Sequence, residues 1–183
     1  MRLLGIAVLL STVLVVSPAS AQGEIEDYAS YDPSSKCHER ARPGTSYLAH
    51  WIVRRYDGGF GGISRDCRRR ATSEHQNGRA FDWTLDATKR SDRKRANAFM
   101  ARIFDTDGRG NTHAWARRMG VMYLIWDDQM YAAWDRFQPE RYLSPSCNRR
   151  TKCSKTLRHR DHMHISLSAK GARGVTSWYD GRL

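Results

Sequence analysis

Two short segments far apart in the chain carry the residue types of a catalytic metal site. The first runs from Ser73 to Asp82 with the sequence SEHQNGRAFD, and the second runs from Asp161 to Ser166 with DHMHIS. Together they supply two histidines and a carboxylate at metal-ligand spacing, with a further histidine and a further acid. A catalytic zinc ion takes three such ligands and leaves one position for water, beside which a base can act. The two segments therefore predict a metal-dependent hydrolase.

The second segment has the alternation of a β-strand, predicted over residues 161–168. Its polar face is formed by His162, His164, Ser166 and Ser168, and its apolar face by Met163, Ile165 and Leu167. Side chains of a strand alternate between two faces, and the apolar face must pack on the core. The histidine face therefore points into a cleft or toward solvent.

The first segment places His75 on a loop and Asp82 on a predicted strand over residues 78–84. In this strand Asp82 lies on the face opposite Phe81 and Trp83. Asp82 alone would be interpreted as a buried structural carboxylate. With His75 and the second segment present, we interpret it as a metal ligand.

The first segment also carries the fixed positions of a known motif, namely Ser73, His75, Gly78, Ala80 and Asp82. Followed by Asp161-His162-x-His164, this pattern resembles the zinc metallopeptidase superfamily of D-alanyl-D-alanine carboxypeptidases, lysostaphin-type endopeptidases and hedgehog domains. The segment GVMYLIW at 120–126 is similar to a secreted, actinobacterial-type branch close to the carboxypeptidases. The resemblance covers most of residues 45–178, and all five fixed positions match.

The resemblance implies one zinc ion per chain, held by His75, Asp82 and His164. Asp161 falls where carboxypeptidase-like members keep an acidic general base, and His162 falls where His-x-His members keep a catalytic histidine. Both residue types can take a proton from water. The sequence leaves the choice open, and we favour Asp161 as the base with His162 stabilising the oxyanion.

Other candidate residues receive weaker interpretations. Ser73 is expected to orient a ligand. The run Arg68 to Arg70 either clamps a substrate carboxylate or forms a solvated basic connector, and we assign it no role. His159 extends the histidine cluster, but its arginine neighbours indicate an exposed rim. The remaining histidines are expected at the surface or in packing contacts: His38, His50 and His113.

The N-terminus indicates export. Met1-Arg2 precedes an apolar run that ends near Val16, and Ala19-Ser20-Ala21 fits a signal-peptide cleavage site. A transmembrane anchor is the alternative, but the run is shorter than the roughly 20 residues a spanning helix needs. We therefore predict a secreted, extracellular protein with a signal peptide at 1–21, an N-terminal arm at 22–44 that begins as a loose polar segment, and one zinc metallopeptidase-like domain at 45–183.

Four cysteines remain after this cleavage, an even number that favours disulfides in an exported chain. Three pairings are possible, and the simplest is local, joining Cys37 to Cys67 and Cys147 to Cys153. A thiolate metal site is the alternative, but the chain contains no Cys-x-x-Cys.

The chain is strongly basic, with a formal net charge of +12 and 25 arginines among its 31 basic residues. Such charge favours anionic partners, here cell-wall polymers, while an arginine-rich codon habit is the alternative explanation. No RNA-binding signature or zinc-finger spacing accompanies the charge, so nucleic acid is not expected as a partner. We expect a monomer without a stable membrane anchor.

The remaining pattern predicts an α+β fold. It has a small antiparallel sheet with helices packed on one side, and the zinc site lies on the exposed sheet face. Helices are expected at 45–56, from Ser91 or Asp92 to about Asp105, and at 112–119, with Gly120 as a C-cap. Strands are expected at 78–84, 121–126, 129–134 and 161–168, and residues 138–160 form a long loop.

These features predict a secreted zinc peptidase, and the resemblance implies that it hydrolyses amide bonds in peptidoglycan peptides, as a carboxypeptidase or an endopeptidase. The alternative is a non-catalytic, zinc-containing protein that binds anionic cell-wall polymers, although the acid Asp161 and His162 would be unnecessary there. A phosphoesterase or nuclease is disfavoured because only one of the two required histidine motifs is present. A serine hydrolase is disfavoured because no Gly-x-Ser-x-Gly occurs.

Overall fold

The computed structural model describes residues 25–67 and 73–183. The predicted signal peptide and the run Arg68 to Arg70 lie outside these ranges. Within them the chain has an α+β fold, as the sequence predicts, built on one antiparallel sheet of six strands in the order β1-β2-β6-β3-β4-β5. The strands are β1 (Gly59–Phe60), β2 (Ala80–Thr84), β3 (Val121–Trp126), β4 (Gln129–Ala132), β5 (Pro139–Arg141) and β6 (His162–Leu167).

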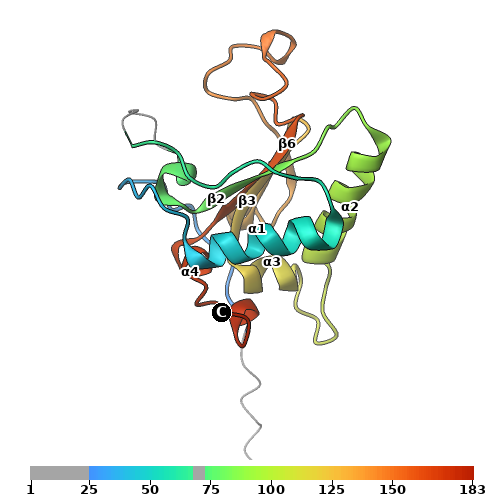
Figure 1. Ribbon diagram of the computed structural model, residues 1–183. Coiled ribbons are helices and arrows are strands. Elements are labelled where there is room, and N and C mark those ends of the chain that lie inside the picture. The colour runs from blue at the N-terminus through green and yellow to red at the C-terminus, as the bar shows by residue number, and fades with distance from the viewer. Residues whose placement is uncertain (1–24, 68–72) are drawn as a thin grey trace, which may run out of the picture.

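Four α-helices pack on one side of this sheet (Figure 1). They are α1 (Pro43–Tyr56), α2 (Arg90–Phe104), α3 (Ala114–Met119) and α4 (Ala169–Arg173). The described chain also has short 3-10 helices at η1 (Glu74–Asn77), η2 (Ala133–Asp135), η3 (Arg150–Lys152) and η4 (Ser177–Tyr179). The core between the two layers takes Leu48 and Ile52 from α1 and Phe99 and Ile103 from α2. These residues recur at helical spacing, which is why each helix has one apolar stripe to bury.

The central strand β6 divides its side chains between the core and the site. Met163, Ile165 and Leu167 are at most 1% exposed and pack in the helix-side core. Because a strand alternates, the intervening His162, His164 and Ser166 belong to the other face. This confirms the alternation predicted for the segment.

A β-bulge at Met122 sets which residues of β3 reach the same face. Val121 pairs with Leu167, but the next pair along β3 joins Tyr123 to Ser166, so one residue of β3 has no counterpart on β6. Val121 packs in the helix-side core, while Tyr123 packs in a second cluster with Met122 and Ile125. The bulge therefore turns Tyr123 toward the histidines, and bulges commonly re-aim side chains next to functional sites.

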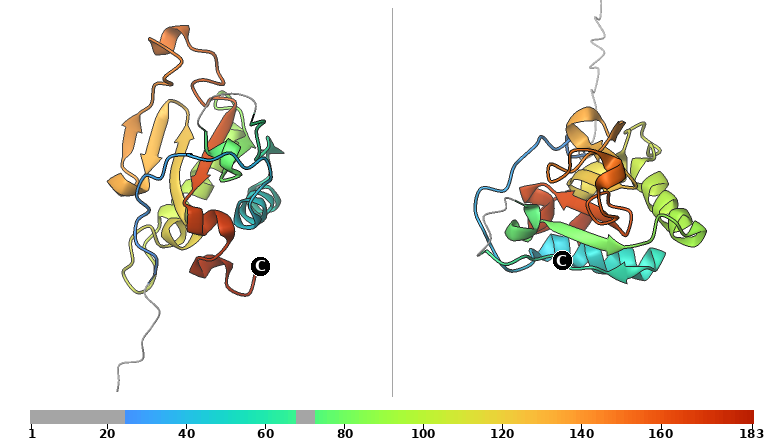
Figure 2. Two further views of the ribbon diagram at one scale, coloured as in Figure 1. Left: turned by 90° about the vertical axis from the view of Figure 1, so that its left-hand side faces the viewer. Right: turned by 90° about the horizontal axis from the view of Figure 1, so that it is seen from above.

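The helix-free face is bordered by two segments that are mostly irregular. Figure 2 shows residues 25–42, in blue, as an extended segment that crosses in front of the strands, and the loop around residues 143–160 projects beyond one end of the sheet. The arm is fastened rather than loose. The buried Arg79 donates to the Asp32 carboxylate at 2.8 Å and to the Asp32 carbonyl at 2.7 Å, and Tyr28 Oη lies 2.8 Å from His113 Nδ1.

The loop before β6 is anchored on the hairpin between β3 and β4. Asp127 and Asp128 make its two-residue turn with φ angles of 47° and 65°. Arg158 donates to both oxygens of Asp128 at 2.9 and 2.7 Å, and Arg160 donates to Asp127 at 2.8 Å. The sequence predicts strands on both sides of this turn, and the two arginines that neutralise the Asp-Asp pair explain the turn itself.

Several short elements differ from the sequence-based expectations. β1 lies in the glycine-rich segment 58–62, where no strand is predicted. β5 lies in the long loop predicted from residue 138, and α4 follows the last strand without having been predicted. Two or three paired residues at a sheet edge carry too little periodicity to be recognised. Helix α1 begins two residues earlier than expected, with Pro43 in its first turn.

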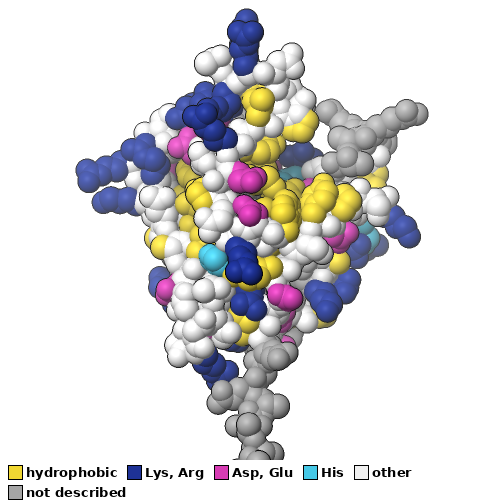
Figure 3. Space-filling model, turned by 180° about the vertical axis from the view of Figure 1, so that it is seen from behind, with side chains coloured by type: hydrophobic (Ala, Val, Ile, Leu, Met, Phe, Trp, Pro, Cys, Tyr) yellow, Lys and Arg dark blue, Asp and Glu magenta, His cyan; other side chains and the backbone are white. Residues whose placement is uncertain are grey.

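Two disulfides join Cys37 to Cys67 and Cys147 to Cys153, which confirms the local pairing. Disulfides persist in oxidising compartments, so the chain is built for such an environment. In the described part of the chain no helix is long and apolar enough to cross a membrane. The basic side chains do not form one continuous patch on the face seen in Figure 3, where lysines and arginines lie at separate places with acidic side chains between them.

Candidate metal centre

Three side chains from two separate segments converge at one point on the helix-free face. His75 Nε2 lies 3.1 Å from Asp82 Oδ1 and 3.2 Å from His164 Nδ1, and the distance between His164 Nδ1 and Asp82 Oδ1 is 3.1 Å. Asp82 and His164 are directly paired across β2 and β6, and η1 places His75 beside them. The structure thus brings together the three residues predicted as metal ligands, and this group could hold a metal ion.

The triangle of donor atoms fits a small tetrahedral ion. Bonds of about 2.0–2.1 Å from zinc to nitrogen or oxygen put neighbouring ligand atoms of a tetrahedron about 3.3 Å apart. The observed separations of 3.1 to 3.2 Å are close to that value. His75 is 2% exposed and His164 is 6% exposed, so both imidazoles are buried beside the partly exposed Asp82.

Both imidazoles are oriented by partners on the far side of the ring. His75 Nδ1 lies 2.8 Å from the Ile63 carbonyl oxygen, which can only accept, so this nitrogen carries the proton. His164 Nε2 lies 2.9 Å from Ser166 Oγ. In both rings the nitrogen that faces away from Asp82 already has a partner, and the other nitrogen lies about 3.1 Å from Asp82 Oδ1. Such outer partners are typical of metal-binding histidines.

A hydrogen-bond chain continues from His164 into the pocket wall. Ser166 is fully buried and bonds to Tyr123, whose hydroxyl donates to Glu74 Oε2 at 2.6 Å. Burial and the neighbouring Glu74 carboxylate raise the pKa of Tyr123 well above its usual range. The tyrosine therefore stays a donor, and the chain ends on an anionic carboxylate.

Asp82 is held as a carboxylate by its surroundings. Burial raises the pKa of Asp82, but hydrogen bonds to His164 and His75 outweigh this effect and hold it well below the usual range. Its second oxygen, Oδ2, lies 3.5 Å from the guanidinium of Arg65, whose side chain is 56% exposed. Arg65 therefore stands beside the predicted ligand set, and its contact with Asp82 is the one ion pair that it makes with residues 25–67 and 73–183.

The two predicted catalytic residues are also at the site, in a definite order. His162 Nδ1 lies 2.7 Å from Asp161 Oδ1, and His162 Nε2 lies 3.7 Å from Asp82 Oδ1. Thr156 Oγ1 donates to the other Asp161 oxygen at 2.6 Å. Partial burial raises the pKa of Asp161, but the hydrogen bonds to Thr156 and His162 have the larger combined effect. The net pKa is therefore below its usual value, and the carboxylate stays charged. His162 thus lies between Asp161 and the ligand set.

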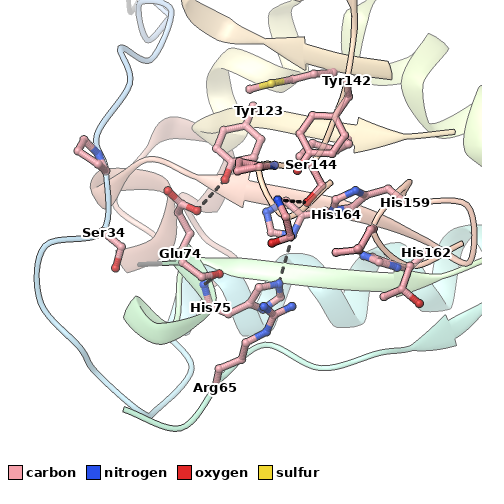
Figure 4. Close-up of a pocket in the computed structure, with 18 of the residues that line it drawn as sticks. Ser34, Arg65, Glu74, His75, Tyr123, Tyr142, Ser144, His159, His162 and His164 are labelled. Atoms are coloured by element: carbon pink, nitrogen blue, oxygen red, sulfur yellow. Dashed lines mark hydrogen bonds between the residues drawn. The ribbon is translucent and has the colours of Figure 1, made fainter. Parts of the chain in front are cut away.

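The donor atoms open into a pocket of about 720 Å³. Figure 4 shows His75, His164 and His162 along its floor, with Arg65 on one side and Tyr142 and Ser144 on the other. His162 lines this pocket, whereas Asp161 is set behind it. The loop around residues 144–157 and the arm at residues 31–34 form the rim, and together they shield the ligands from bulk water.

His159 lies in the pocket wall rather than on the exposed rim predicted for it. Arg158 and Arg160 turn away to the hairpin, and the ring of His159 packs 4.7 Å from His162 and 5.1 Å from Tyr142, between ring centroids. Burial, followed by the nearby His164 and His162, lowers the pKa of His159 to about 3. It is therefore a neutral ring that helps to fix the orientation of His162.

Two residues of this site, Arg65 and Glu74, have no role in the sequence-based interpretation, which offers Tyr123 as a cleft residue with core packing as the alternative. Glu74 was visible beside His75 inside the motif, and Arg65 lies ten residues before that histidine. Their contacts depend on the glycine-rich loop and on the bulge in β3, which sequence spacing does not reveal. Ser73 caps η1 by accepting from the His75 amide at 3.4 Å, and so it positions a predicted ligand as expected.

Comparison with known protein families adds one finding. The family model described as VldE, C-terminal domain, matches residues 37–149, which is more than half of the chain. The matched range includes His75 and Asp82 and ends before His164. No curated protein and no solved structure matches the chain.

Proposed function

This chain belongs to the family of the VldE C-terminal domain, and we propose that it is a secreted zinc-dependent peptidase acting on peptidoglycan peptides. The observation that carries the proposal is the convergence of His75 Nε2, Asp82 Oδ1 and His164 Nδ1 beside the His162–Asp161 pair. The peptide substrate class comes from the resemblance of the two motifs to the zinc metallopeptidases.

The ligand set favours zinc over other divalent ions. Two imidazole nitrogens and one carboxylate oxygen are ligands that zinc takes in catalytic sites, while calcium and magnesium prefer oxygen ligands alone. When bound, zinc lowers the pKa of a water molecule to about 7 and polarises a carbonyl group. The remaining chemistry belongs to the side chains around it.

We assign the general base to His162, in place of the preference for Asp161 that the motif alone suggests. His162 Nε2 points toward the ligand set and can take the proton of the attacking water, whereas Asp161 Oδ1 is occupied by His162 Nδ1–H. The carboxylate fixes the tautomer of the ring and stabilises the imidazolium that forms. This arrangement follows the general logic of a base oriented by an acid.

Arg65 supplies positive charge on the opposite side of the ligands. Its guanidinium can stabilise the oxyanion that develops when an amide carbonyl is attacked, or it can pair with a substrate carboxylate. Either role explains why an exposed arginine is held against Asp82 at 3.5 Å. The pocket rim limits water around these groups, which strengthens each electrostatic contact.

The test begins with the metal content of the purified protein from residue 22, for wild type, His164→Ala and the surface control His38→Ala. We expect about one zinc per chain in wild type and in the control and none in His164→Ala, with release of amino acids or shorter peptides from wall peptides detected by mass spectrometry. A wild type that binds no divalent metal at neutral pH would overturn the proposal. Bound zinc without hydrolysis of any wall peptide would instead favour the non-catalytic alternative, in which the basic surface binds anionic wall polymers.

A further inference from the structure

One end of the pocket combines a carboxylate with three aromatic rings. Glu74 and Tyr123 line this end together with Tyr31 from the arm and Trp134 from η2. Figure 4 shows Glu74 on the side of the ligand histidines that faces away from His162. The pocket therefore has two chemically different ends with the predicted metal ligands between them.

The Glu74 carboxylate has one oxygen to spare. The residue is 7% exposed, and its Oε2 accepts from Tyr123 at 2.6 Å. Its Oε1 has no hydrogen-bond partner, and no lysine or arginine pairs with the carboxylate, among residues 25–67 and 73–183. Oε1 is also not enclosed by protein atoms. A largely buried carboxylate that has no counter-charge among these described residues favours a cationic ligand that donates hydrogen bonds.

The rings beside it are arranged to favour the same kind of ligand. Tyr31 packs edge-on against Trp134 with centroids 5.3 Å apart, and Tyr123 packs against Trp134 at 6.0 Å. Tyr31 is 57% exposed and Trp134 is 43% exposed, although large aromatic side chains usually bury more of their surface. The faces of such rings attract cations, tryptophan most strongly.

We propose that Glu74, Tyr31, Tyr123 and Trp134 form an ammonium subsite, which binds a primary ammonium group of the substrate peptide. A primary ammonium supplies the N–H donor that Oε1 lacks and a charge for the rings. An anionic group would be repelled by Glu74, and a neutral apolar group would leave Oε1 dry and unpaired.

The subsite also fixes how a peptide would lie. The Tyr123 ring stacks on His164 with centroids 5.5 Å apart, and its hydroxyl reaches Glu74. A bound ammonium group would therefore be separated from the ligand set by the length of the Tyr123 side chain, near the bond to be cut. The position of the ammonium group relative to a cleaved bond rests on the proposed function, whereas the binding of an ammonium group at this subsite does not.

The experiment measures binding to the chelator-treated, metal-free protein by titration calorimetry. Three lysine methylamides serve as probes: one with only the ε-amine free, one with only the α-amine free, and one with both amines acetylated. We expect at least one monoamine to bind about tenfold more tightly than the doubly acetylated probe, and the stronger monoamine identifies which amine the subsite takes. Equal affinity for all three probes would overturn the proposal.

Two variants locate the effect. Glu74→Gln keeps an acceptor for Tyr123 but removes the charge, and it should reduce monoamine affinity to the level of the doubly acetylated probe. Trp134→Leu should weaken monoamine binding several-fold while leaving the Glu74–Tyr123 hydrogen bond. Glu140→Gln, an exposed acid on β5 with the same change in net charge, is the matched control and should bind as wild type does.

The outcomes remain separate from those of the proposed function. Monoamine binding that is unaffected by both Glu74→Gln and Trp134→Leu would remove the subsite even if wall peptides are hydrolysed. Selective binding that both variants abolish would establish the subsite even if the metal-loaded protein cleaves nothing.

Discussion

At the scale of single residues, the site is defined by which atom of each side chain is already engaged. The Ile63 carbonyl accepts a hydrogen bond from His75 Nδ1–H, and Ser166 Oγ is hydrogen-bonded to His164 Nε2. The other ring nitrogens, His75 Nε2 and His164 Nδ1, therefore face Asp82. Asp161 likewise engages Nδ1 of His162. Under the proposed function, the base and the ligands would thus be oriented before a metal or substrate binds, as preorganised sites require.

The order of Asp161 and His162 leads to a prediction about activity. His162→Ala should lower kcat by a factor of about 10² to 10⁴, because it removes the proton acceptor, while zinc content stays near one per chain. Asp161→Asn keeps the ring in place and should cost only about 10- to 100-fold, as expected for a residue that orients another. The measurement is kcat on a wall peptide beside zinc content for each variant.

The opposite ranking would show that Asp161 is the base. In that case Asp161→Asn would be nearly inactive and His162→Ala would keep most of the activity. Thr156→Val is the control for orientation, since Thr156 touches only Asp161 within this group. It should produce a smaller loss than Asp161→Asn.

At the scale of elements, the sequence predicts the parts that depend on local spacing. Alternation in β6 places His162 and His164 on one face. Alternation in β2 likewise places Asp82 on the face opposite Phe81 and Trp83. The register between these strands, which pairs Asp82 with His164, is a long-range property that the strand pattern does not reveal. The motif resemblance implied only that the two residues share a metal ion. The bulge in β3 and the position of Arg65 were not predictable, because both depend on contacts across the sheet.

The disulfide between Cys37 and Cys67 holds two of these elements together. It ties the arm to the loop that carries Ile63 and Arg65, over a sequence separation of 30 residues. In a loop-entropy model such a crosslink stabilises the fold by roughly 3.5 kcal/mol. Cys37→Ser with Cys67→Ser should therefore lower the free energy of unfolding by about that amount, measured by urea denaturation, and should also weaken zinc binding because the carbonyl partner of His75 is less fixed.

The second disulfide is the matched control for this prediction. Cys147 and Cys153 close a separation of only 6 residues within the rim loop, for which the same model gives roughly 2 kcal/mol. Cys147→Ser with Cys153→Ser should therefore leave zinc affinity unchanged. Equal losses of zinc affinity in both double variants would contradict the idea that the Cys37–Cys67 disulfide supports zinc binding by fixing the loop that carries Ile63.

At the scale of the whole molecule, stability and charge are set by different groups. The formal net charge is +12, and on the face seen in Figure 3 the basic side chains lie at separate places. Several carboxylates pair with basic side chains, among them Asp86 with Lys155 and Asp107 with Arg118. Asp86 and Asp107 have their pKa lowered to about 2, chiefly by hydrogen bonds to Thr88 and Asn111. Their contribution to stability is present above about pH 4 and is lost as the pH falls toward 2.

The buried histidines should make the metal-free protein sensitive to acid at a higher pH than these carboxylates. Burial lowers the pKa of His159 to about 3 and also lowers that of His164, while an unfolded histidine titrates near 6.5. Between these values the unfolded chain binds protons that the folded chain refuses, so stability falls as the pH drops below about 6.5, by up to about 1.4 kcal/mol per pH unit for each such group. Urea unfolding between pH 4 and 8 in the presence of a chelator measures this slope.

His159→Gln separates its share from that of His164. The variant keeps a polar side chain in the pocket wall but cannot titrate, so its stability should fall less steeply between pH 6.5 and 4 than that of wild type. Tyr142→Phe, which keeps the ring that packs on His159, should retain the wild-type slope. If His159→Gln and wild type have the same slope, His159 is not held neutral by the fold, and the acid sensitivity of the metal-free protein arises from other groups.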